Sequence, residues 1–136
     1  MPFFWISLII LLGSLAAFIE VLIGIKKIRR LEDIMPALGK EAPRVSIIFS
    51  ALNEAATIAP ALRSMLSLDY PDLEIIAIND RSTDGTGELL DSLAVGNERL
   101  RVLYVRDLPP GWLGKNHALH LGAQVAGGDY LLFTDA

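Results

Sequence analysis

The sequence predicts an α/β fold, with a mainly parallel sheet preceded by one transmembrane helix. Three observations lead to this prediction. A long apolar stretch opens the chain, short apolar runs then alternate with helical patterns, and polar side chains follow each apolar run. Strands that alternate with helices indicate a parallel sheet covered by helices on both faces. The 136 residues are enough for about one domain of this kind.

The first element is an apolar stretch from Met1 to Ile25, in which Glu20 is the only ionisable side chain. Roughly 20 apolar residues in a helix suffice to cross a bilayer core. A cleaved signal peptide or a buried core helix are the alternatives, but a signal peptide normally begins with positive charge, whereas "KKIRR" follows the apolar stretch here. Residues 1–30 are therefore predicted to form a transmembrane anchor with a basic juxtamembrane segment.

The basic segment also predicts an orientation, because cationic residues beside a spanning helix tend to stay on the cytoplasmic side. We expect a single pass through the cell inner membrane, with the remainder of the chain in the cytoplasm. Residues 31–43, "LEDIMPALGKEAP", mix charge with proline and glycine and are predicted to be a linker.

The composition beyond the linker excludes some classes of protein. From Lys40 onward acidic side chains outnumber basic ones, which argues against nucleic acid as a partner because phosphates require a basic face. The absence of cysteine excludes disulfide scaffolds and thiolate metal sites.

The first half of the predicted sheet begins with "RVSIIFSALNE", in which Val45–Phe49 is expected to be a buried strand. The segment "AATIAPALRSMLSL" has apolar residues at helical spacing, and Pro60 is comfortable there only in the first turn of a helix. After the turn "DYPDL", the run "LEIIAIND" is expected to be a second buried strand.

The second half repeats this alternation. Turn residues in "RSTDGTGELLDSLA" lead into an amphipathic helix, and "LRVLYVRD" is expected to be a third strand. The segment "LPPGWLGKN" is predicted to be a loop, "HALHLGAQVAGG" a helix and "DYLLFTD" a fourth strand. His117 and His120 are three residues apart on that helix, but no third metal ligand is evident, so a packing role is favoured.

Polar groups at the ends of the four strands predict where a ligand binds. In open parallel sheets, ligands bind beyond the carboxyl ends of the strands. A helix cap explains the turn residues "STD" after the second strand. It does not explain why this apolar strand ends in two consecutive polar residues, Asn79 and Asp80. A carboxylate at that place is able to accept hydrogen bonds from a base or a sugar hydroxyl. The candidate residues are, in chain order, Ala51, Asn53, Glu54, Asn79, Asp80, Lys115 and Asp135.

These motifs together resemble a known family. An apolar strand ends in "SALNE", "DYP" leads to a strand ending in "ND" with "STD" after it, "GKNHAL" opens a helix, and "GDY" precedes the last strand. From Val45 to the last residue, this order resembles the family 2 glycosyltransferases of the GT-A fold. The loop "LPPGWLGK" further resembles membrane-anchored members that glycosylate lipids such as hopanoids, carotenoids or ceramide.

The resemblance implies a Rossmann-like, nucleotide-binding half of a GT-A domain over residues 44–136. It also implies that the domain is truncated, because the acceptor site and the catalytic base of the family lie in a second half. The chain by itself is therefore expected to be inactive.

The resemblance also implies a role for each candidate residue. The turn from Ala51 to Glu54 would line the nucleotide pocket, Asp80 would bind uracil or an equivalent base, and Lys115 would approach the base or the diphosphate. Asp135 would be the first acid of an Asp-x-Asp pair and would hold Mg²⁺ or Mn²⁺, which prefer carboxylate oxygens. Asn79 stands where the family usually has aspartate, so the base contact is placed on Asp80.

The function implied is an inverting glycosyltransferase that transfers a sugar from a nucleotide-diphosphate donor, expected to be a UDP-sugar, to a lipid or polysaccharide acceptor. A membrane-tethered module that binds nucleotide sugars without catalysis is one alternative. A sugar-phosphate nucleotidyltransferase is another, but those enzymes open with a glycine-rich loop after the first strand, and "SALNEAAT" has no glycine.

Overall fold

A computed structural model describes residues 1–28 and 42–135 of the chain. The chain divides into two units, Met1–Leu38 and Gly39–Ala136, and each is described here by itself. The predicted linker, residues 31–43, lies outside the described residues except for its last two positions, as do Arg29 and Arg30 of the basic segment.

In the first unit, the described residues 1–28 contain one helix, α1 (Pro2–Lys27), which has 26 residues. None of these residues is buried. At 1.5 Å per residue the helix is about 39 Å long, more than the ~30 Å of a bilayer core. The only hydroxyl in its first two turns, that of Ser7, donates to the carbonyl of Phe3 at 2.9 Å. By length and composition, α1 is a candidate membrane span.

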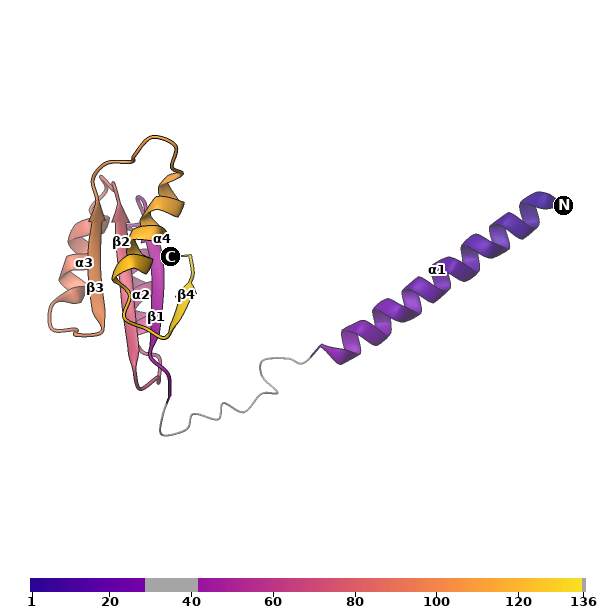
Figure 1. The fold of residues 1–136 in the computed structure, drawn as a ribbon, viewed down its shortest axis with the longest axis horizontal. Helices are drawn as coiled ribbons and strands as arrows, with labels where there is room; N and C mark the ends of the chain where they lie inside the picture. The colour runs from indigo at the N-terminus through magenta and orange to yellow at the C-terminus, as the bar shows by residue number, and fades with distance from the viewer. Residues whose placement is uncertain (29–41, 136) are drawn as a thin grey trace. The chain divides into compact units, whose positions relative to one another are not determined.

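The second unit is a four-stranded parallel sheet with three helices (Figure 1). Its strands run in the order β3-β2-β1-β4, and every neighbouring pair is parallel. The α/β fold with a parallel sheet is therefore confirmed. The strands are β1 (Val45–Ala51), β2 (Leu73–Asp80), β3 (Leu100–Val105) and β4 (Tyr130–Phe133), and the helices are α2 (Ile58–Leu66), α3 (Thr86–Ala94) and α4 (Gly114–Val125).

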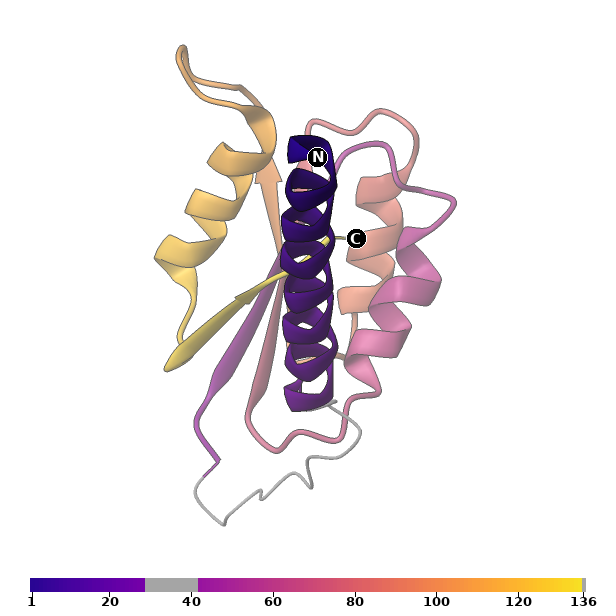
Figure 2. The same ribbon diagram turned by 90° about the vertical axis from the view of Figure 1, so that its right-hand side faces the viewer.

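The helices cover opposite faces of the sheet, with α2 and α3 on one side and α4 on the other (Figure 2). Successive side chains of a strand point to opposite faces. Phe49 and Ile75 accordingly pack with α2 and α3, whereas Ile48 and Ile76 pack beneath α4. All four side chains are fully buried. Burial on both faces is the reason that β1 and β2 are almost continuous apolar runs.

Two elements differ from the sequence prediction. Helix α4 begins at Gly114, so Lys115 lies in its first turn and not in the preceding loop. The residue before the helix, Leu113, makes no side-chain cap, and the sequence therefore carries no capping signal at this point. Strand β4 pairs with β1, and all four of its residues are exposed in the described part of the chain.

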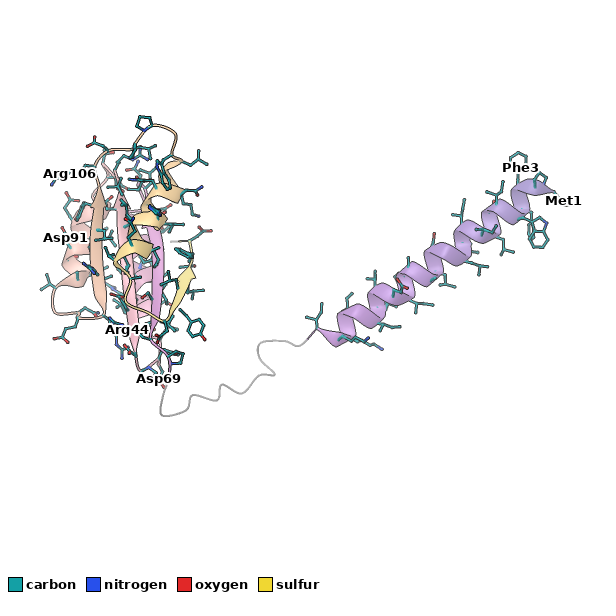
Figure 3. All side chains as sticks on the ribbon, viewed as in Figure 1. Met1, Phe3, Arg44, Asp69, Asp91 and Arg106 are labelled. Atoms are coloured by element: carbon teal, nitrogen blue, oxygen red, sulfur yellow. The ribbon has the colours of Figure 1, made fainter. Side chains whose placement is uncertain are left out.

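A polar cluster at the amino end of the sheet fixes the turn between α4 and β4. Ser46 is fully buried, donates to Glu74 Oε2 at 2.7 Å and accepts from the N–H of Gly128 at 2.9 Å. A Cβ on Gly128 would lie 2.6 Å from the backbone nitrogen of Ser46, so only glycine fits there. The N–H of Gly127 also donates to Glu74, and Arg44, labelled in Figure 3, lies 3.8 Å from that carboxylate.

The cluster predicts a pH dependence of stability. Burial raises the pKa of Glu74, but hydrogen bonds from Gly127 and Ser46 and the charge of Arg44 outweigh it, so the pKa lies below its ordinary value of 4.5. The stabilisation is therefore complete above the unfolded-state pKa and is lost as the pH falls through the folded-state pKa. Glu74→Gln should lower the free energy of unfolding by about 1 kcal/mol at pH 7 and by much less at pH 3.

Urea unfolding at a series of pH values, followed by circular dichroism, measures this difference. Glu98→Gln is the matched control, because Glu98 is exposed and its replacement should change little at any pH. A loss of stability in Glu74→Gln that is the same at pH 3 and pH 7 would contradict the assignment.

Candidate functional site

Two loops at the carboxyl edge of the sheet are held together by hydrogen bonds. One connects β1 to α2 and the other connects β2 to α3. Three backbone N–H groups of the first loop donate to three side chains that follow β2, at distances between 2.9 and 3.0 Å: Asn53 to Ser82 Oγ, Glu54 to Thr86 Oγ1 and Ala55 to Asp84 Oδ2. The "STDGT" stretch therefore fixes the "LNE" turn in place.

Asp84 is the central acceptor of this connection. Its carboxylate accepts from the hydroxyl of Thr86 at 2.5 Å and from the N–H of Ala55 at 3.0 Å. These two hydrogen bonds, the first being the stronger cause, hold the pKa of Asp84 below its usual range. Gly85 occupies the cap position of α3 and makes no side-chain cap, so the polar residues before it serve mainly to join the loops.

A cavity of about 440 Å³ opens at this edge. From β1 the chain builds the sheet outward through β2 to β3, and then returns through α4 to place β4 on the other side of β1. The cavity thus lies where the strand order reverses, which is where ligands bind in open α/β sheets. It is lined by Ser50, Leu52, Glu54, Asp80, Arg81, Gly114, Lys115 and Asp135.

The structure brings four of the seven predicted site residues to this cavity: Glu54, Asp80, Lys115 and Asp135. They come from the ends of β1, β2 and β4 and from the first turn of α4. Asp80 is 3% exposed, whereas the side chain of Asp135 is 80% exposed. The cavity therefore has one sheltered carboxylate at its inner end and one solvated carboxylate at its rim.

The other three predicted residues have structural contacts. Ala51 is buried, and its carbonyl accepts from Ser82 Oγ at 3.3 Å. The side-chain oxygen of Asn53 accepts from the N–H of Thr83 at 2.9 Å, and that of Asn79 accepts from the N–H of Ser82 at 3.1 Å. Asn79 lines a neighbouring cavity and not the one that contains Asp80, as alternation along a strand requires. A direct nucleotide contact for these three residues stays a prediction.

Two ion pairs determine the charge inside the cavity. The guanidinium of Arg81 donates to both oxygens of Asp80, with Nε to Oδ1 at 2.8 Å and Nη2 to Oδ2 at 3.2 Å. At the rim, Lys115 Nζ pairs with Asp135 Oδ1. No group of three His, Cys, Asp or Glu side chains that could hold a metal occurs among residues 1–28 and 42–135. Asp135 could hold a metal only together with further ligands from a substrate and from water.

The sequence analysis did not place Arg81 or Gly114 in the site. Arg81 is the polar residue directly after β2, and nothing in the sequence indicates that it turns back onto Asp80. A Cβ on Gly114 would lie 2.5 Å from Arg81 Nη2 and 2.8 Å from Asp80 Oδ2, so glycine lets α4 approach this pair. The two histidines of α4 both pack against Trp112, with ring centroids 5.4 Å and 5.1 Å away, which agrees with the packing role.

The sheet, the reversal of strand order and the polar edge define an α/β domain of the nucleotide-binding type. Comparison with known proteins specifies the family. Residues 46–136 match the model of the family described as glycosyl transferase family 2. The chain belongs to this family.

Curated relatives agree with this assignment. The probable glycosyltransferase YdaM of Bacillus subtilis is 34% identical over 99 residues, which cover 71% of this chain and 23% of the relative. The poly-beta-1,6-N-acetyl-D-glucosamine synthase of Staphylococcus epidermidis is 36% identical over 92 residues, which cover 68% of this chain and 21% of the relative. The chain thus spans less than a quarter of the length of either relative.

Solved structures show the same fold. The mannosyltransferase PcManGT from Pyrobaculum calidifontis, in complex with GDP-Man and Mn²⁺, superposes with a TM-score of 0.60 at 32% identity, covering 71% of this chain and 28% of that one. Staphylococcus aureus TarS in complex with UDP gives a TM-score of 0.57 at 24% identity, covering 68% and 27%. The GT-A fold expected from the motifs is therefore confirmed.

Proposed function

We propose that this chain is the donor-binding half of a membrane-anchored, inverting glycosyltransferase. Its donor would be a UDP-sugar and its acceptor a lipid or a polysaccharide. The observation that carries the proposal is the convergence of Asp80, Lys115 and Asp135, from three different elements, on one cavity of about 440 Å³. Membership in glycosyltransferase family 2 favours this function over a sugar-phosphate nucleotidyltransferase.

The inner end of the cavity is suited to a base. The side chain of Asp80 is a hydrogen-bond acceptor in a sheltered position, and it matches a base that presents an N–H, such as N3–H of uracil. Guanine presents N–H groups as well, and a related mannosyltransferase is known with GDP-Man and another family structure with UDP. A uridine nucleotide is the proposed donor because the resemblance of the motifs to the family implies a UDP-sugar.

The outer end of the cavity is suited to a diphosphate. Gly114 and Lys115 belong to the first turn of α4, whose free backbone N–H groups and positive dipole end favour an anion. The ammonium group of Lys115 adds a full positive charge, which pairs with the carboxylate of Asp135. A diphosphate that binds here competes with Asp135 for Lys115 and leaves that carboxylate available for a cation.

A divalent cation, Mg²⁺ or Mn²⁺, would supply Lewis-acid stabilisation of the diphosphate that leaves when the sugar is transferred. Asp135 is the residue of this chain that fits such a cation, because its carboxylate is solvent-accessible and lies at the same edge as Lys115. The related mannosyltransferase bound to Mn²⁺ supports this proposal.

The proposed membrane anchor supports a lipid acceptor. α1 is long and apolar enough to span a bilayer, and "KKIRR" after it favours a single pass through the cell inner membrane with the sheet in the cytoplasm. A donor site tethered in this way has access both to nucleotide sugars and to lipid acceptors. The relative that makes poly-beta-1,6-N-acetyl-D-glucosamine makes a polysaccharide acceptor equally suitable.

The proposal predicts that Asp80→Ala weakens UDP binding by about ten- to a hundredfold, because a hydrogen bond to a buried charged group is lost. Isothermal titration calorimetry of the complete, detergent-solubilised protein with UDP measures this. Glu88→Ala is the matched control, since Glu88 lines the neighbouring cavity and should not affect affinity. Equal affinity of the wild-type protein and Asp80→Ala would overturn the base-binding role.

A further inference from the structure

Arg81 makes an unusual contact with the residue directly before it in the chain. Arg81 is the first residue after β2, which ends at Asp80, so strand alternation no longer separates the two side chains. The guanidinium of Arg81 donates to both oxygens of Asp80, at 2.8 and 3.2 Å. A forked contact of this kind fixes the plane of the carboxylate, which a single hydrogen bond does not do.

The backbone makes this contact possible. Arg81 has a φ of +60°, in the left-handed region, which residues other than glycine rarely adopt. Asp80 and Arg81 both line the same cavity, and Arg81 also lines the neighbouring one. The N–H of Arg81 still donates to the carbonyl of Val105 at 3.2 Å, so the turn begins only after the sheet pairing is complete.

The first turn of α4 encloses the pair. Gly114 approaches so closely that a Cβ would meet Arg81 Nη2 at 2.5 Å and Asp80 Oδ2 at 2.8 Å. The Asp80 side chain is 4% exposed and that of Arg81 is 34% exposed. The guanidinium therefore compensates a carboxylate that would be costly to bury alone, and the Arg81 side chain remains partly exposed where it lines the cavity.

We propose that Arg81 is a positioning residue that determines which base the site accepts, through the forked contact that fixes both oxygens of Asp80 as acceptors. This inference rests on the proposed function of Asp80 and extends it. A carboxylate held by a guanidinium has only acceptor capacity left, so it selects a base that presents an N–H, such as uracil. Cytosine presents an unprotonated ring nitrogen at the same position, and an acceptor facing an acceptor is repelled.

The test uses Arg81→Gly, because glycine adopts the left-handed backbone of position 81 without strain and the variant removes only the side chain. UDP and CDP affinities of the complete protein are measured by calorimetry. We expect Arg81→Gly to bind UDP about tenfold more weakly and the preference for UDP over CDP to fall by a similar factor. Arg81→Lys, which keeps the charge but loses the fork, should restore part of the affinity and little of the preference.

A double-mutant cycle separates this inference from the proposed function. If Arg81 acts through Asp80, Arg81→Gly has no further effect on UDP affinity in an Asp80→Ala background. Arg106→Ala, from the neighbouring cavity, is the control and should leave the UDP preference unchanged.

Three outcomes would overturn the inference. An unchanged UDP preference in Arg81→Gly, while Asp80→Ala alone weakens binding, leaves the proposed function standing and removes the role of Arg81. Additive losses in the double variant would mean that Arg81 contacts the nucleotide directly. No effect of Asp80→Ala would remove the base-binding role itself, and with it the role of Arg81.

Discussion

Asp135→Asn should remove most of the Mn²⁺-dependent sugar transfer by the complete protein, by about a hundredfold or more, and should leave the fold intact. The fold is expected to survive because the Asp135 side chain is 80% exposed and its partner Lys115 is itself 55% exposed. Pairs this exposed contribute little to stability. The activity is expected to fall because asparagine keeps the shape of the ligand but loses the negative charge that a hard divalent cation requires.

Sugar transfer and donor hydrolysis, each measured with and without Mn²⁺, test this prediction, and circular dichroism confirms the fold. Asp107→Asn is the control, since Asp107 is also an exposed aspartate after a strand end but does not line the cavity. Metal-free UDP affinity should not fall in Asp135→Asn, because the diphosphate no longer competes with a carboxylate for Lys115. Full Mn²⁺-dependent activity in a folded Asp135→Asn protein would show that this carboxylate is not a metal ligand.

Leu11→Arg/Leu12→Arg should move the protein from the membrane fraction to the soluble fraction. Both leucines lie near the middle of α1, and neither is buried by the protein. Each arginine at the centre of a spanning helix costs roughly 2.5–3.5 kcal/mol on insertion scales, so the pair removes most of the driving force for insertion. Alkaline carbonate extraction followed by immunoblotting measures the partition.

The same preparation tests the orientation. In sealed inverted vesicles, protease should digest the residues after α1, because the basic segment favours the cytoplasmic side. Val21→Leu is a suitable control, since it changes a residue of the same helix without adding charge. Release of the wild-type protein by carbonate, or protection of its C-terminal part in inverted vesicles, would contradict the anchor or its orientation.

The fold was predictable because its elements have strong patterns. The apolar runs of β1 and β2 are long and uninterrupted, and burial on both faces leaves them no alternative to a central parallel sheet. The residue pattern alone placed the start of α4 too late, because neither Leu113 nor Gly114 is a capping residue. The resemblance of "GKNHAL" to the family placed it correctly, and Gly114 there closely approaches the Asp80–Arg81 pair.

The site was predictable to the extent that it depends on strand ends. Asp80 is the last residue of β2 and Asp135 lies two residues after the end of β4, and parallel strands bring both to one edge. Asn79 precedes Asp80 in the sequence and was grouped with it, but alternation turns it to a different cavity. The position of Arg81 depends on a left-handed backbone angle that arginine rarely adopts, and no sequence pattern indicates it.

The tight turn before β4 also controls the register of the strand that carries Asp135. β4 pairs with β1 from Val45↔Tyr130 to Ile48↔Phe133, and Gly128 is fixed on Ser46 just before that pairing begins. A slip of one residue would move Asp135 by about 3.3 Å and turn its side chain to the opposite face of the sheet. A serine and a glycine at the far end of the strand thus decide whether the carboxylate faces the cavity at all, so a substitution there would alter metal dependence without touching the site.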